Sequence, residues 1–553
     1  MEPAGLATGG LGIALAFKGA IDTSLFIKSF FDEDNLSCGT LALRYHIEKT
    51  RLNTWGNYCK AGDALNCIFR DRPRVIKDDI TRILGEIQKY DEQADDMVKK
   101  YDIKLPELPN NVSDEGIRFG SPMTIALAKR SMKTRPNSRF RWTITARPSF
   151  ENIVVQIHGL ITELETLTLQ PWETRLLANA LTPFALAPLD RRDLLEILGT
   201  SGSQIQRTIA LSAEAKLLQP RISPDITSVP PSIPFNQLEF PGSSPNIGTL
   251  ICSDGQRRVV WVEWIILDPA SDYSKHIKRI LSLGSVLKQV SEPAMRLPSF
   301  YGMFDDLRYE ANYQRKKLGY VFAPPNEGSI YDNVQRYEYE ANLLDHPPIS
   351  LSELIKNQKP QDQGCKPVPI PSLGDRFQLA YTLACAFGRF HAAGWLHKGF
   401  HAGSILFFER INDQGILLTE PFITGFQYSR PQGQNSLSYS PLMDNKLEYY
   451  YLPESMNGFT KRLDLYSLGV VLCEIGRWDL LGRKRGKITS QEKWREFITG
   501  DVLKDLSWRM GTKYQGAVRV LLNCELPGDE LGDQVFAQEF LKKVMLPLSS
   551  CSA

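Results

Sequence analysis

Three of the seven histidines, His391, His397 and His401, lie within eleven residues. Histidine is the commonest metal ligand, and an H-x-x-x-H spacing can bind Zn²⁺ when it lies on a helix. No cysteine or acidic residue nearby completes the ligand set, and Gly399 interrupts the helix that this spacing requires. We therefore predict no metal site and expect packing or surface roles for these histidines.

The stretch 397–406, HKGFHAGSIL, aligns with the protein-kinase consensus H-R-D-L-K-P-E-N-I-L. Three further segments follow in the order of kinase landmarks, namely GFQ at 425–427 for D-F-G, YLPE at 451–454 for A-P-E, and DLYSLG at 464–469. The C-terminal half therefore resembles a protein kinase, which implies a two-lobed α+β fold. The resemblance implies structural roles for Pro453, Glu454, Asp464 and Gly469, with Asp464 accepting backbone hydrogen bonds from the catalytic loop.

The residues that perform phosphoryl transfer are missing from these segments. The reaction needs an acidic residue that orients the hydroxyl group, and oxygen ligands that hold Mg²⁺ on the phosphates. Gly399 stands at the position of the acidic base, Ser404 at that of the metal-binding asparagine, and Gly425, followed by Phe426, at that of the metal-binding aspartate. The loop keeps His397 but lacks the side chains that perform phosphoryl transfer.

The preceding strands lack the phosphate-binding groups as well. No lysine lies between Lys216 and Lys275, and Ile265 or Ile266 stands near the place expected for the lysine. Residues 273–290 contain no acidic partner, and no G-x-G-x-x-G motif precedes the strand. We predict a pseudokinase that is not an enzyme and holds no cofactor, and the sequence leaves open whether a nucleotide still binds. A divergent active kinase that uses displaced residues is the alternative.

Hydrophobic periodicity divides the chain of 553 residues into two domains. Apolar residues at three-and-four spacing predict an all-α bundle over 1–218, and prolines and serines predict a linker over 219–246. Residues 247–548 place strands first, including 257–267, and helices afterwards, as in an α+β domain. The fold class is thus multidomain, all-α followed by α+β.

The helical half resembles the HeLo domain of filamentous fungi, the prion-inhibition and propagation family of the HET-s incompatibility proteins. The resemblance rests on the apolar opening 4–27, on RLNTWG at 51–56, and on the aromatic and basic entry into a long amphipathic helix at 139–168. It implies a membrane-perturbing cell-death module that forms homo-oligomers, whose first helix leaves the bundle and inserts into lipid. The amyloid-forming tail motif of that family is not evident.

Two features of the residues themselves permit contact with a membrane. The opening segment carries only Lys18 and Asp22 as charges, and Gly5 and Gly9 form a small-x-x-x-small pair that allows close helix packing in lipid. A basic cluster without acids could attract an anionic membrane, and it comprises Arg118, Lys129, Arg130, Lys133, Arg135, Arg139, Arg141 and Arg147. A buried core helix and a solvated basic face are the alternatives.

Composition limits the remaining choices. The net charge of +2 gives no reason to expect nucleic acid as a partner. Nine scattered cysteines without C-x-x-C pairs predict reduced thiols, and Glu2 without a basic segment argues against an export signal. We predict a cytoplasmic signalling protein, recruited to the plasma membrane, in which a pseudokinase controls a HeLo-like bundle. A non-lytic protein-interaction scaffold is a further alternative, and the sequence names no upstream protein partner.

Overall fold

The computed structural model forms two compact units, Met1–Ala213 and Glu214–Ala553. It describes residues 3–22, 36–100, 147–187, 189, 192, 195–196, 207–217, 230–241, 245–252, 255–267, 273–290, 296–324, 343–357, 370–411, 415–431, 447–456, 458–482, 488 and 490–552. The two units divide within α10 (Arg207–Leu217), slightly before the predicted end of the helical bundle at 218.

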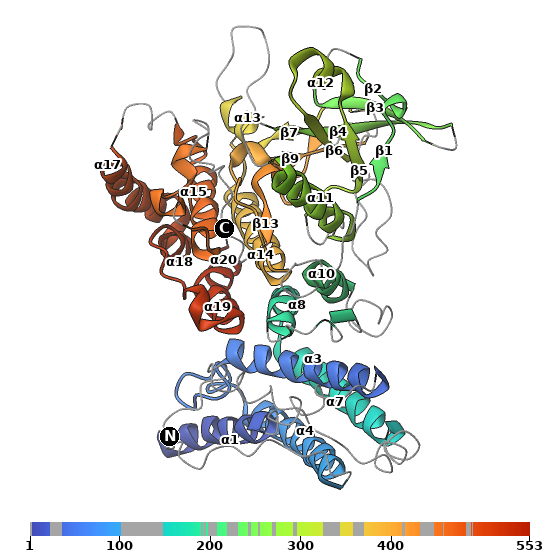
Figure 1. The fold of residues 1–553 in the computed structure, drawn as a ribbon. Helices are drawn as coiled ribbons and strands as arrows, with labels where there is room; N and C mark the ends of the chain where they lie inside the picture. Colours follow the sequence, from blue (N-terminus) through green and yellow to red (C-terminus); the bar gives the residue numbers. More distant parts are fainter. Residues whose placement is uncertain are drawn as a thin grey trace. The chain divides into compact units, whose positions relative to one another are not determined.

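The first unit is helical in its described part, as the periodicity predicts (Figure 1). Its main helices are α1 (Pro3–Asp22), α3 (Leu36–Cys59), α4 (Arg74–Lys100), α7 (Arg147–Thr168) and α8 (Pro171–Leu186). Helix α4 packs against α1 and α7, and α3 packs against α1, α7 and α8.

The apolar stripes of these helices meet in one core. Helix α7 buries residues at three-and-four spacing, including Ile153, Ile157, Ile161 and Leu164. Helix α8 begins directly after α7 because Pro171 occupies its first turn, where a missing N–H is tolerated. The Glu173 carboxylate accepts the backbone N–H of Gln170 at 2.6 Å and so fixes this start.

Helix α1 turns only one face toward this core. Ile13, Phe17 and Ala20 are buried, whereas Leu11 and Leu15 are 51% and 63% exposed. Gly5, Gly9 and Asp22 lie within the same helix, and Lys18 is exposed. None of the helices in the described ranges has the length and apolar character needed to cross a membrane.

The second unit combines a mixed sheet with helices, which is compatible with a two-lobed α+β fold (Figure 1). Six strands lie in the order β1-β5-β6-β4-β3-β2. Their bounds are β1 (Ser232–Ile233), β2 (Leu238–Glu239), β3 (Ile247–Ile251), β4 (Arg257–Ile266), β5 (Phe300–Asp305) and β6 (Lys317–Phe322). Helix α12 (Leu307–Tyr313) connects β5 to β6.

Helix α11 (Tyr273–Val290) packs on β5, and the hydroxyl group of Tyr320 on β6 donates to the Ile280 carbonyl at 3.0 Å. The sheet and α11 are thus held together by packing and by one buried hydrogen bond.

The structure differs from the linker predicted over 219–246. Ser232–Ile233 and Leu238–Glu239 form β1 and β2, the two edge strands of the sheet. Proline lacks an N–H but can border an edge strand, whose outer side needs no partner. Pro231 accepts a backbone hydrogen bond from Met303 at 2.7 Å, so the described residues 230–241 belong to the folded unit.

The rest of this unit is mainly helical. Helices α14 (Leu373–Ala392), α15 (Lys461–Arg477) and α18 (Leu503–Leu522) pack together, and the Tyr514 hydroxyl group of α18 donates to the Leu472 carbonyl of α15 at 2.8 Å. Shorter helices are α13 (Leu351–Lys356), α17 (Gln491–Glu496), α19 (Asp533–Phe540) and α20 (Leu546–Ser549). Short strands between the helices are β7 (Ile349–Ser350), β8 (Trp395–Leu396), β9 (Ile405–Phe407), β10 (Glu409–Arg410), β11 (Gly415–Ile416), β12 (Phe422–Ile423) and β13 (Arg430–Pro431).

Candidate functional site

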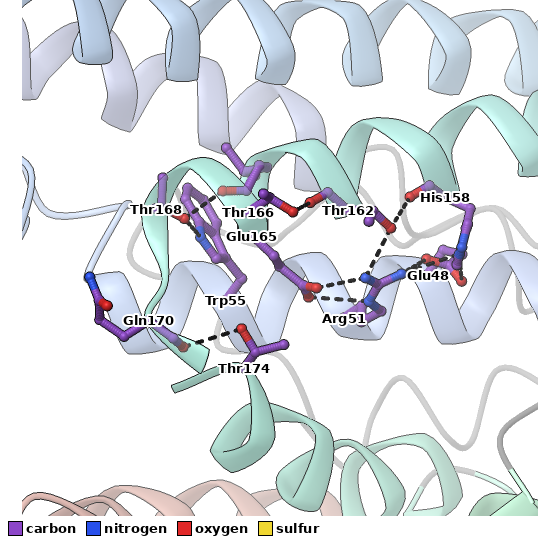
Figure 2. Close-up of polar contacts among 11 residues, drawn as sticks. Glu48, Arg51, Trp55, His158, Thr162, Glu165, Thr166, Thr168, Gln170 and Thr174 are labelled. Atoms are coloured by element: carbon purple, nitrogen blue, oxygen red, sulfur yellow. Dashed lines mark hydrogen bonds and ion pairs between the residues drawn. The ribbon is translucent and has the colours of Figure 1, made fainter. Parts of the chain in front are cut away.

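Arg51 on α3 ties this helix to α7 (Figure 2). Its Nε donates to Glu165 Oε1 at 3.1 Å and its Nη2 to Glu165 Oε2 at 2.6 Å, while Nη1 donates to Glu48 at 3.0 Å. Burial alone would lower the pKa of Arg51, but the two carboxylates outweigh it and raise this pKa. Because Glu165 is 8% exposed, this bidentate pair is largely shielded from water.

His158 on α7 extends the same contact (Figure 2). Its Nδ1 lies 2.9 Å from Glu48 Oε1, and the hydrogen bond to Glu48 raises the pKa of the ring. Thr162, one turn further along α7, accepts from Arg51 Nη2 at 3.2 Å. One arginine on α3 therefore engages two turns of α7.

Trp55, on the next turn of α3, fixes the end of α7. Its indole Nε1 donates to Thr168 Oγ1 at 2.9 Å (Figure 2). Its fully buried ring stacks on that of Phe69, with 5.9 Å between the ring centroids. The same ring lies 6.0 Å from that of Phe17 on α1. Trp55 thus contacts both α1 and α7.

Gly56, the next residue, receives α1. A Cβ atom at this position would lie 1.8 Å from Phe17 Cζ, a separation that no side chain can adopt. The Phe17 ring therefore occupies the space above the glycine backbone. The RLNTWG segment thus uses Arg51 and Trp55 to hold α7, and Gly56 to seat α1.

A buried charge network fixes the last turn of α1. Lys49 Nζ donates to Asp91 Oδ2 at 2.5 Å and also to the carbonyl of Ala20, and the Tyr45 hydroxyl group donates to Asp91 Oδ1 at 2.6 Å. Burial lowers the pKa of Lys49, although Asp91 opposes this shift, and burial raises that of Tyr45. A cation at a helix C-terminus satisfies a carbonyl that has no partner within the helix.

In the second unit, Asp464 on α15 organises the loop that follows β8. Its buried carboxylate accepts the backbone N–H groups of His397 and Lys398, each at 2.9 Å, and contacts His391 Nε2 at 2.9 Å. Burial would raise the pKa of Asp464, but these partners, His391 above all, lower it. The backbone hydrogen bonds expected of Asp464 from the sequence are present.

The other two histidines also have local partners. His397 Nε2 lies 2.9 Å from the Thr424 carbonyl, and burial lowers the pKa of this ring to about 4. A neutral His397 donates from Nε2, which leaves Nδ1 to accept from Gly399 N at 3.2 Å. His401 Nδ1 lies 2.9 Å from the Gly399 carbonyl. Among the described residues, no group of three or more potential ligands could hold a metal ion.

Atoms of neighbouring residues lie close to the positions that were predicted to have lost catalytic side chains. A Cβ atom at Gly399 would lie 3.0 Å from the Gly425 carbonyl oxygen and 3.1 Å from Tyr428 Cδ2. Ser404 is buried, and its hydroxyl group donates to the His401 carbonyl at 2.8 Å. A side chain at position 399 would therefore have to displace these neighbours by a few tenths of an ångström.

Gly425 adopts a left-handed conformation with φ 83°, and a Cβ atom there would lie 2.8 Å from Ser404 Cβ. Phe426 follows it and is fully buried, with its ring 4.9 Å from that of His397. These residues join the core of the second unit and present no metal-binding oxygen from their side chains.

Glu263 on β4 is the residue that the sequence analysis missed. Its carboxylate accepts Gly425 N at 2.9 and 3.0 Å. Of the two residues placed near the position expected for the lysine, Ile265 is buried in the core and Ile266 is 51% exposed. A signal was available, since Glu263 is the one acid in the apolar run 257–267.

The remaining predicted residues lie apart from this loop or outside the residues that the structure describes. Pro453 and Glu454 are exposed in a short turn, and Gly469 on α15 allows a close approach of α18, since a Cβ atom there would lie 3.0 Å from Leu521 Cβ. Most of the predicted basic cluster, Arg118, Lys129, Arg130, Lys133, Arg135, Arg139 and Arg141, lies outside the described residues, whereas Arg147 begins α7.

In its described part, the first unit is thus a helical bundle in which α1 and α7 pack on α3. Residues 5–181 match the family model of HeLo, described as prion-inhibition and propagation, which supports a HeLo domain at the N-terminus. This domain relates the helical unit to fungal incompatibility and cell death. No curated protein matched the chain.

We predict that Arg51→Ala destabilises the helical unit by about 1–3 kcal/mol, because Glu165 then loses its bidentate partner in a poorly hydrated place. Urea unfolding followed by far-ultraviolet circular dichroism measures this change. Arg82→Ala is the matched control, since Arg82 pairs with Glu163 on the same helix α7 but both side chains are more than half exposed, so its cost stays below about 1 kcal/mol. Equal losses in the two variants would contradict the role of Arg51.

Proposed function

We propose that this chain is a non-catalytic signalling protein in which the C-terminal unit, a pseudokinase, controls a membrane-perturbing N-terminal HeLo domain. The observation that carries the non-catalytic part is the loop at 397–404. Asp464 holds its backbone through His397 N and Lys398 N, while Gly399 has no side chain and Tyr428 fills the space beside it. A loop shape without reactive groups suits a binding role better than phosphoryl transfer.

The acidic side chain of Glu263 supports the same proposal. Phosphoryl transfer needs a cation and metal ions near the phosphate groups. The group that approaches Gly425 from β4 is a carboxyl group, which supplies no positive charge to bind a phosphate. The proposal therefore assigns no role to Mg·ATP.

The asymmetric burial of α1 supports the membrane part. The helix holds the bundle through Phe17, seated over Gly56, and through its Ala20 carbonyl, bound by Lys49. Its opposite face exposes Leu11 and Leu15. A helix with one buried and one exposed apolar face can exchange contacts with the bundle for contacts with lipid.

The non-catalytic part predicts that the full chain transfers no labelled phosphate from Mg·ATP, either to itself or to a general protein substrate. Mg²⁺ is also expected to make no difference to its thermal unfolding midpoint in the presence of ATP, because Ser404 and Gly425 stand at the positions of the metal-binding asparagine and aspartate. Magnesium-dependent transfer of phosphate would instead establish a divergent active kinase.

The membrane part predicts dye release from vesicles that contain phosphatidylserine, and much less release from neutral phosphatidylcholine vesicles. Residues 1–218 alone should release dye faster than the full chain, because the controlling unit is absent, and deletion of residues 4–27 from that fragment should abolish release. Circular dichroism checks that both fragments are helical. If the fragment leaves both vesicle types intact, the non-lytic scaffold is the better account.

A further inference from the structure

Glu263 connects the six-stranded sheet of the second unit to the loop 424–428. It lies inside β4, where the neighbouring residues Val262 and Trp264 turn toward the apolar cluster on the other face of the sheet. Its Oε1 and Oε2 accept Gly425 N at 2.9 and 3.0 Å, and Oε2 lies 3.4 Å from Phe426 N. The Glu263 carboxylate thus joins β4 to a loop that lies far from it in the sequence.

The groups around this carboxylate offer hydrogen bonds but no countercharge. Thr424 contributes a side-chain hydrogen bond, and Tyr320, opposite Glu263 on β6, directs its hydroxyl group to the Ile280 carbonyl. Arg279 on α11 interacts with Tyr320 and Tyr428. The ring of His397, whose Nε2 lies 2.9 Å from the Thr424 carbonyl, has a pKa lowered to about 4. Among the described residues, no cation contributes to the pKa of Glu263.

A carboxylate in such a place is costly in its ionised form, because water is replaced by donors that only partly compensate. Burial raises the pKa of Glu263 to about 7, although the N–H groups of Gly425 and Phe426 oppose the shift. The pKa in the fold thus exceeds the ordinary value of 4.5. The stability that the bound proton contributes is complete below about 4.5 and is lost as the pH rises through about 7.

We propose that Glu263 is a proton-controlled strap between β4 and the loop 424–428. In its neutral form the carboxyl group accepts the loop amides without the cost of a buried charge, and it holds the loop against the sheet. In its ionised form it gains more from water than from these amides, and the loop loosens. This device belongs to the second unit and holds whether or not that unit controls the HeLo domain.

The test compares the full chain with its Glu263→Gln variant over pH 5–8.5. Glutamine keeps the size and the acceptor oxygen but cannot ionise, so the variant should unfold at a midpoint roughly 2–6 °C above the wild type at pH 8 and close to it at pH 5. Glu239→Gln is the matched control, since Glu239 is an exposed acid of the same sheet and pairs with Arg257. Its curve should follow that of the wild type.

Buried Glu474, whose pKa burial raises to about 8, titrates in all three proteins and cancels from the difference. A gap between wild type and Glu263→Gln that does not change with pH would overturn the proposal.

A measurement on the wild type covers the case in which Glu263→Gln does not fold. Hydrogen exchange of the Gly425 and Phe426 amides, corrected for the intrinsic effect of pH, should lose at least several-fold protection between pH 6 and pH 8. The Ser455 and Asn523 amides, which donate to the backbone carbonyls of Leu452 and Arg519, serve as references and should not change. Equal behaviour of the two sets of amides would overturn the strap.

Discussion

The steric fit of Phe17 over Gly56 is the constraint on which the helical unit depends. The phenyl ring lies where any other residue at position 56 would place its Cβ atom, so α1 can approach α3 only because that position is glycine. The ring of the neighbouring residue, Trp55, packs against the same Phe17 ring, and its indole N–H donates a hydrogen bond to Thr168 at the end of α7. Two adjacent residues of α3 therefore set the places of two other helices.

Both units use buried charge to fix a chain segment by its backbone. In the first unit Lys49, paired with Asp91, binds the Ala20 carbonyl at the end of α1. In the second unit Asp464 binds the N–H groups of His397 and Lys398. A buried ion needs several partners to offset the loss of water, so each such group restrains its segment in one arrangement.

Periodicity predicted much of the architecture because it reports which face of an element is buried. The helical character of the first unit, a long helix within 139–168, a strand within 257–267 and helices after the strands were predicted, and the described residues show each of them. The linker prediction failed in its second half because proline content reports a missing donor, and edge strands tolerate that loss as well as linkers do. The pseudokinase assignment stays a prediction.

The candidate site was harder to predict than the elements, because it depends on pairs of residues brought together by folding. The alignment of 397–406 identified the loop around His397, but the strand register that turns Glu263 toward Gly425 is not visible in a single strand. Likewise RLNTWG was recognised only as part of a resemblance. Its physical role required the positions of Phe17 and Glu165 on other helices.

Hydrogen exchange of the α1 amides in the full chain tests the central claim most directly, with Gly56→Ala compared with Gly85→Ala. A methyl group at position 56 collides with the Phe17 ring, whereas one at position 85, in the middle of α4, meets nothing within 4 Å. The account predicts that α1 loses most of its protection in Gly56→Ala and keeps it in Gly85→Ala, where alanine favours the helix. Unchanged protection of α1 in Gly56→Ala would contradict it.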